Sequence, residues 1–130
     1  MIAGMTPVLQ SGTYVFCSTL HNQDATTAMT VARGMFVEDE GLSLILPKAE
    51  AERLELAYAE PMKQITLMVY SSVSGVGLTA AVARELARER ISASIIAATQ
   101  HDHIFVPAKL ADKAMDLLRN LQKRAQDDLA

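Results

Sequence analysis

The chain has 130 residues, of which half are hydrophobic and 21% are charged, so we exclude intrinsic disorder and expect one compact domain or two small ones that share a core. Twelve basic and fifteen acidic residues give a net charge of −3 without any basic block, which argues against a nucleic-acid surface. The single cysteine, Cys17, excludes an internal disulfide. Because we find neither a signal-peptide pattern nor a stretch long enough to span a membrane, we expect a cytoplasmic protein.

The first half of the chain alternates short segments of strand and helix character. Its expected elements, in chain order, are a strand over residues 14–18, a helix over 25–31, strands over 35–38 and 42–46, and a helix over 48–56. Pro47 favours the first position of the last helix, and Pro61 ends the segment. Residues 1–12 have no clear period, so we expect only an extended lead-in there.

The second half shows clearer periodicity. Its expected elements are a strand over residues 65–70, a helix that begins near Leu78, strands over 92–98 and 103–106, and a helix that begins at Pro107. The order is β-α-β-β-α, which gives five of the six elements of a ferredoxin-like unit without its last strand. The first half repeats the same order, which predicts a duplicated α+β module. The missing strand would leave a sheet edge that pairing with a second copy could cover.

The segment from Ser71 to Gly77 joins the first strand and helix of the second half. It contains three serines, two glycines and no charged residue. Its backbone N–H groups are expected at the N-terminus of the following helix, the positive end of the helix dipole, where they would face any bound ligand. Such a loop suits a carboxylate or another small anion, although the glycines could instead serve only a tight turn. Leu78 stands where a phosphate-binding loop has lysine, and the third glycine of a dinucleotide motif is missing, so we do not expect nucleotide binding.

Three further residue groups have both functional and structural interpretations. His101 and His103 alternate along a strand and could share a metal, yet they supply only two ligands. Asp102 between them could stabilise a hairpin turn, or it could accept a hydrogen bond from the amino group of a bound zwitterion. Cys17 lies in an apolar strand, where a buried thiol behaves as a small hydrophobic side chain. The acidic run at residues 38–40 is expected to be a solvated turn.

Several motifs together resemble one family. The segments are SSVSGVGLTAAVA from Ser71, ISA from Ile91, HDHIFVP from His101, YVFC from Tyr14 and EGLSLILP from Glu40. In their order and spacing along the chain they resemble small bacterial ACT-domain proteins with two tandem ACT-like halves. More distantly, they resemble the regulatory domains of aspartate kinases. The resemblance implies an α+β, ferredoxin-like fold of tandem β-α-β-β-α modules with antiparallel sheets. We place the two halves at residues 1–61 and 62–130.

The same resemblance implies a role and a site. ACT domains pair side by side and commonly bind a free amino acid where two of them meet, so we expect a non-catalytic, amino-acid-binding regulatory module without a cofactor, most simply a homodimer. The expected contacts come from the loop, from the second strand and from the hairpin: Ser71, Ser72, Val73, Ser74, Gly75, Val76, Gly77, Leu78, Ile95, Ile96, Ala97 and Asp102. Alternatives are an interaction scaffold that binds no small molecule and a small metal-assisted enzyme that uses His101 and His103.

Overall fold

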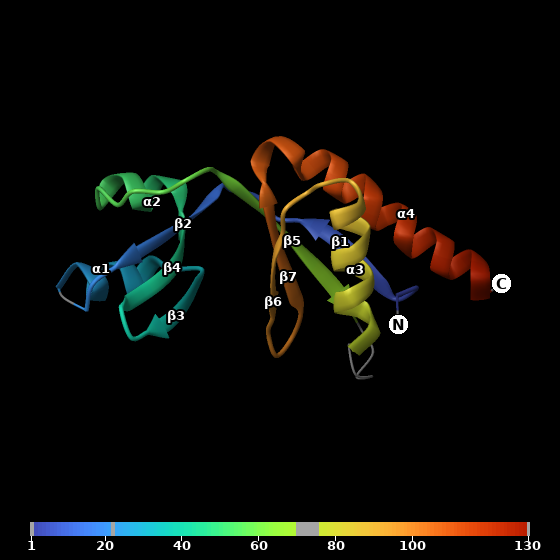
Figure 1. Cartoon of the computed structure of the whole chain (residues 1–130), viewed down its shortest axis with the longest axis horizontal. Helices are drawn as coiled ribbons and strands as arrows, with labels where there is room; N and C mark the ends of the chain where they lie inside the picture. Colours follow the sequence, from blue (N-terminus) through green and yellow to red (C-terminus); the bar gives the residue numbers. More distant parts are fainter. Residues whose placement is uncertain (1, 22, 70–75, 130) are drawn as a thin grey trace. The chain divides into compact units, whose positions relative to one another are not determined.

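A computed structural model describes residues 2–21, 23–69 and 76–129 of the chain (Figure 1). The chain divides into two compact units, which are treated separately below. The first unit comprises residues 12–62, and the second comprises residues 1–11 together with residues 63–130. None of the helices in the described part of the chain is both long and apolar enough to cross a lipid bilayer.

The first unit is a three-stranded antiparallel sheet with two short helices. Its elements are β2 (Tyr14–Thr19), α1 (Gln23–Val31), β3 (Gly34–Glu38), β4 (Gly41–Pro47) and α2 (Lys48–Arg53). The strand order is β3-β4-β2, so β4 is central and β3 lies at an edge. Alternate residues of β2 and β4 point to the helices and form the core with three alanines: Val15, Cys17, Leu42, Leu44, Leu46, Ala25, Ala28 and Ala51.

Helix α2 is shorter than the sequence indicated. It ends at Arg53, three residues before the predicted end, because Glu55 adopts a left-handed backbone conformation with φ 58°. The N–H of Leu56 then bonds back to the carbonyl oxygen of Ala51 at 2.9 Å. This six-to-one bond is the Schellman closure that terminates many helices, and glycine usually occupies its left-handed position. Glutamate at this position concealed the stop signal.

The second unit is a four-stranded sheet covered by two long helices. Its elements are β1 (Met5–Leu9), β5 (Met62–Val69), α3 (Val76–Arg88), β6 (Ser94–Ala97), β7 (Asp102–Pro107) and α4 (Ala111–Leu129), with a single 3-10 turn at Ala108–Leu110 before α4. The strand order is β1-β5-β7-β6. Apolar residues of α3 and α4 pack on one face of this sheet: Leu78, Val82, Leu86, Ala114, Met115 and Leu118 meet Ile65, Leu67, Ile104 and Val106.

The N-terminal strand β1 completes the sheet of the second unit. It pairs antiparallel with β5, from Met5 opposite Val69 to Leu9 opposite Ile65, and the Met5 side chain is fully buried in the core of this unit. The expectation that the last strand of the module is missing was therefore wrong, because β1 occupies the position beside β5. The sequence-based division grouped residues 1–11 with the first half, whereas their contacts group them with residues 63–130.

Helices and antiparallel strands alternate in both units, which confirms the predicted α+β class. The second unit holds all six elements of a ferredoxin-like module, with the final strand contributed from the other end of the sequence.

Candidate functional site

The loop that the sequence singled out lies mostly outside the described residues, which exclude Ser71, Ser72, Val73, Ser74 and Gly75. The described part begins with Val76 and Gly77, the first two residues of α3, and Gly77 is exposed. Leu78 is only 2% exposed and packs in the core of the second unit. Its side chain is therefore not available to a ligand, and only its backbone could take part in a site.

The other predicted contacts lie on β6 and β7. Ala97 pairs with Asp102 where the β6–β7 hairpin begins, and the backbone N–H of Ala98 donates to the carbonyl oxygen of His101 at 3.1 Å to close the turn. Figure 1 places this hairpin end and the start of α3 at the same end of the second unit. The start of α3, which includes Gly77, and the hairpin end formed by Ala97 and Asp102 thus lie at the same end of the unit.

The two isoleucines of β6 have different environments. Ile95 is partly buried and packs against the core that the helices cover. Ile96 is 38% exposed, lies on the other face of the sheet, and pairs with His103 of β7. Because β6 ends the strand order of the second unit, its outer backbone groups lie at the edge of that sheet. A ligand at this edge would meet the backbone of β6 and the side chain of Ile96 before it met Ile95.

The histidine pair belongs to a buried polar cluster that sequence reasoning missed. His103 Nδ1 lies 3.0 Å from Nε2 of Gln64 and 3.0 Å from Oγ1 of Thr66. Gln64 and Thr66 are 4% and 2% exposed, and Gln10 Nε2 donates to Thr66 Oγ1 at 3.0 Å. The sequence did contain one signal for this cluster. Gln64 and Thr66 are both polar and alternate along β5, which puts them on the same face of the strand, away from the helices.

A metal site at His101 and His103 would need a third ligand, and the described residues do not supply one. The His101 and His103 rings meet edge to face with centroids 6.4 Å apart, and His101 Nδ1 is buried without a hydrogen-bond partner there. His103 Nδ1 already contacts Gln64 and Thr66. Across residues 2–21, 23–69 and 76–129, no three His, Cys, Asp or Glu side chains gather closely enough to hold a metal ion.

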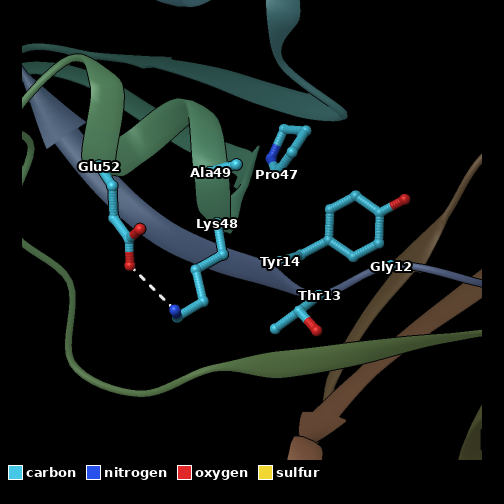
Figure 2. Close-up of a pocket in the computed structure, with 7 residues that line it drawn as sticks. All are labelled: Gly12, Thr13, Tyr14, Pro47, Lys48, Ala49 and Glu52. Atoms are coloured by element: carbon cyan, nitrogen blue, oxygen red, sulfur yellow. Dashed lines mark ion pairs between the residues drawn. The ribbon is translucent and has the colours of Figure 1, made fainter.

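A solvent-open cavity of about 410 Å³ lies in the first unit, where β2 begins and β4 passes into α2 (Figure 2). An apolar wall and the Lys48–Glu52 ion pair both contribute to its lining. The lining residues are Gly12, Thr13, Tyr14, Pro47, Lys48, Ala49 and Glu52. The backbone N–H of Lys48 donates to the carbonyl oxygen of Thr13 at 2.9 Å, which ties the start of α2 to the start of β2. The guanidinium of Arg33 lies 5.3 Å from the centre of the Tyr14 ring, a cation–π contact.

The ion pair of this cavity keeps both of its groups charged at neutral pH. Lys48 Nζ lies 2.9 Å from Glu52 Oε1, and the Tyr58 hydroxyl donates to the same oxygen at 2.9 Å. The hydrogen bond from Lys48, followed by that from Tyr58, lowers the pKa of the Glu52 carboxyl. The same contact with Glu52 raises the pKa of Lys48. The four-residue spacing of Lys48 and Glu52 was readable in the sequence, but the approach of Tyr14 was not.

A smaller hollow of about 190 Å³ lies beside the β3–β4 turn and is lined by Ser18, Thr19, Leu20, Glu38, Glu40, Gly41, Leu42 and Ser43. The Ser43 hydroxyl donates to the Glu38 carboxylate. Residues 38–40 are exposed, as the prediction of a solvated acidic turn requires.

Comparisons with known proteins identify the class. An ACT-domain family model matches residues 1–63, and a second ACT-domain model matches residues 61–120. The chain therefore belongs to the ACT-domain proteins and carries two ACT domains in tandem, which confirms the family resemblance and the predicted ferredoxin-like fold. A search of curated proteins found no match.

Solved structures with the same fold come from several bacteria. A Vibrio cholerae protein of unknown function, described as a possible transport protein, is 37% identical, with a TM-score of 0.83 over 93% of this chain and 92% of that one. An Agobacterium tumefaciens protein is 16% identical, with a TM-score of 0.72 over 91% and 89% of the two chains. The ligand-free regulatory subunit of aspartate kinase from Thermus thermophilus is 11% identical, with a TM-score of 0.66 over 91% and 97%. The last two likenesses concern the fold alone.

Proposed function

We propose that this protein is a non-catalytic regulatory module that binds a free amino acid. Its two ACT domains carry the proposal, because ACT domains are regulatory, ligand-binding modules. The fold that it shares with the regulatory subunit of an aspartate kinase is consistent with this role. The ligand would bind at the end of the second unit where α3 begins.

The chemistry of that edge suits a zwitterion. The ligand carboxylate would accept hydrogen bonds from N–H groups between Val73 and Gly77, at the positive end of the thirteen-residue helix α3. The ligand ammonium would lie near Asp102, which begins β7 at the same end of the unit (Figure 1). Strand β6 would supply the floor, since its outer backbone edge is the edge of this sheet.

Gly77 offers a test of this site. A Gly77→Val variant places a branched side chain at the second residue of α3 and should abolish amino-acid binding measured by isothermal titration calorimetry. Ala83→Val is the matched control, because Ala83 is also exposed on α3 but lies almost two turns further along. Retained affinity in the Gly77→Val variant, with the fold intact by circular dichroism, would exclude the loop as the ligand site.

We propose that the module associates through strand β3. Met35, Phe36 and Val37 are 46%, 72% and 63% exposed, and they follow one another on an edge strand of the first unit. Exposed apolar edge strands favour pairing with another strand. Antiparallel pairing centred on Phe36 would place Phe36 opposite its copy and Met35 opposite Val37 of the second copy, so every exposed apolar residue of the strand would meet an apolar one. We therefore place the homodimer contact at β3.

A charge on β3 tests the contact. Phe36→Lys should convert the dimer to a monomer in sedimentation velocity experiments, because antiparallel pairing would bring two ammonium groups together. Leu20→Lys is the control, since Leu20 is 67% exposed but lies outside β3. An unchanged mass in Phe36→Lys would reject β3 as the interface.

The same edge also favours a second candidate function, an interaction scaffold that binds no small molecule. A chain that self-associates through β3 but binds none of the twenty amino acids would support the scaffold over the sensor.

A further inference from the structure

The cavity of the first unit has the composition of a small-ligand site. Its volume of about 410 Å³ falls in the range of small-molecule pockets, which are mostly apolar and carry a few placed polar groups. Figure 2 shows the Tyr14 ring and Pro47 on one side of the cavity and the Lys48–Glu52 pair on the other. The whole lining belongs to residues 12–62.

The ion pair retains the capacity to bind a ligand. Lys48 and Tyr58 both contact Oε1 of Glu52, so neither of these two contacts uses Oε2 of the carboxylate. The Lys48 ammonium has three donors, and its contacts are with the Glu52 carboxylate and the Tyr58 hydroxyl. The cavity wall therefore presents a cationic donor and an anionic acceptor next to each other. A ligand with both charges on adjacent groups matches that arrangement without separating the pair.

The apolar wall is held in a fixed position opposite the charges. Tyr14 is buried at the start of β2, and Arg33 stacks on its ring. Gly12 approaches the Tyr14 hydroxyl so closely that an added Cβ would lie 3.4 Å from it, and Gly12 has a φ of +95° that favours glycine. The ring is thus supported by its neighbours before any ligand arrives.

We propose that this cavity is a second amino-acid site, which takes a free α-amino acid with an apolar side chain. Lys48 Nζ binds the carboxylate, Glu52 Oε2 accepts from the ammonium group, and the side chain packs on Tyr14 and Pro47. The site goes beyond the proposed function, because it is separate from the Ser71–Gly77 loop and needs no residue from a second copy. It gives the first ACT unit a ligand of its own.

L-leucine is the probe for this site. Titration of the uniformly 15N-labelled chain with L-leucine should shift the backbone amide signals of Thr13, Tyr14, Lys48 and Ala49 saturably in two-dimensional NMR spectra. L-leucinamide lacks the carboxylate and N-acetyl-L-leucine lacks the ammonium group, so each should bind at least about tenfold more weakly, in line with the loss of a charge-assisted hydrogen bond. Equal binding of all three compounds would overturn the assignment of the charges.

Charge variants assign the contacts to residues. Lys48→Met and Glu52→Gln should each weaken L-leucine binding about tenfold or more, while the double exchange Lys48→Glu with Glu52→Lys keeps both charges and should restore much of it. Lys109→Met removes an exposed lysine from the second unit and serves as the control. Unchanged affinity in both single variants would overturn the proposal.

The titration also separates this proposal from the proposed function. Shifts confined to α3 and β6, lost in Gly77→Val, would support the loop site and reject the cavity. Shifts confined to the cavity residues, retained in Gly77→Val, would do the reverse. A spectrum that L-leucine leaves unchanged throughout would reject the cavity as a site for apolar amino acids.

Discussion

Gln10 and Thr66 are 56 positions apart in the chain, and the Gln10 side-chain amide donates to the Thr66 hydroxyl at 3.0 Å. The backbone N–H of Gln10 also donates to the carbonyl oxygen of Gln64 at 2.9 Å. Both bonds hold the end of the N-terminal segment against β5 within the second unit. The second ACT unit therefore depends on residues that precede the first one in the sequence.

Thr66→Val should destabilise the second unit. The substitution keeps the shape of the side chain but removes the hydroxyl that contacts Gln10, Gln64 and His103. Gln64 is only 4% exposed, so water cannot readily replace that contact. We expect a loss of about 1–3 kcal/mol in the free energy of unfolding, the cost of leaving buried polar groups unpaired. Urea denaturation measures it. Thr79→Val on the exposed face of α3 should change stability little, and equal effects of the two variants would contradict the role of the cluster.

Gly41 and Gly34 should respond differently to the same substitution. A Cβ on Gly41 would lie 2.4 Å from the carbonyl oxygen of Thr19, and the residue has a φ of +149°. A Cβ on Gly34 would meet only the Ile45 side chain, whose nearest atom, the terminal Cδ1, would lie at 3.3 Å. Gly41→Ala should therefore lower the unfolding free energy by about 1–3 kcal/mol or more through backbone strain. Gly34→Ala should lower it by much less, and thermal unfolding of the two proteins gives the comparison. The same midpoint for both would refute the predicted clash.

Cys17 should be chemically inert in the folded protein. It is 7% exposed in the core of the first unit, and burial raises the pKa of its thiol. The thiol is thus protonated at neutral pH, whereas alkylation requires the thiolate. Iodoacetamide should modify Cys17 slowly in buffer and rapidly in concentrated urea. Fast modification of the native protein would indicate a reactive cysteine and would reopen a catalytic interpretation.

The charge pair at Lys48 and Glu52 predicts a specific pH response. The pKa of Glu52 is lowered from its ordinary value of 4.5, so the pair's contribution is fully present above pH 4.5 and is lost as the pH falls through the lower folded-state value. The pKa of Lys48 is raised from 10.5, so its contribution is complete below that pH and is lost only at higher pH. NMR titration of the Glu52 side chain should give a midpoint below 4.5, and Lys48→Met should raise it. The same midpoint in the two proteins would argue against the pair.

Much of the fold could be predicted because its elements have strong local signals. Alternating apolar residues marked β4 and β5, and apolar stripes marked α3 and α4. Strand β1 escaped prediction because it contains Pro7 and is short, and its evidence is the pairing with β5, about sixty residues later. Proline is tolerated there because β1 is an edge strand. A local sequence pattern does not reveal a pairing strand that lies so far away in the sequence.

The candidate sites were predictable only in part. The loop beginning at Ser71 was visible as a glycine-containing turn between a strand and a helix, but Leu78 was assigned to the ligand although its side chain belongs to the core. The cavity of the first unit was not visible, because Tyr14 and Lys48 come from different elements that meet only in the folded chain. The same holds for His103 and Gln64, which β7 and β5 bring together.

The central claim is that the protein binds a free amino acid. A thermal-shift screen of the purified full chain against the twenty amino acids, each well above its expected dissociation constant, tests it most directly. Ligand that binds only the folded state stabilises it by about 2.7 kcal/mol at a hundredfold excess over the dissociation constant, so one or a few amino acids should raise the midpoint saturably. An unchanged midpoint across all twenty would contradict the claim and would leave the scaffold as the better account.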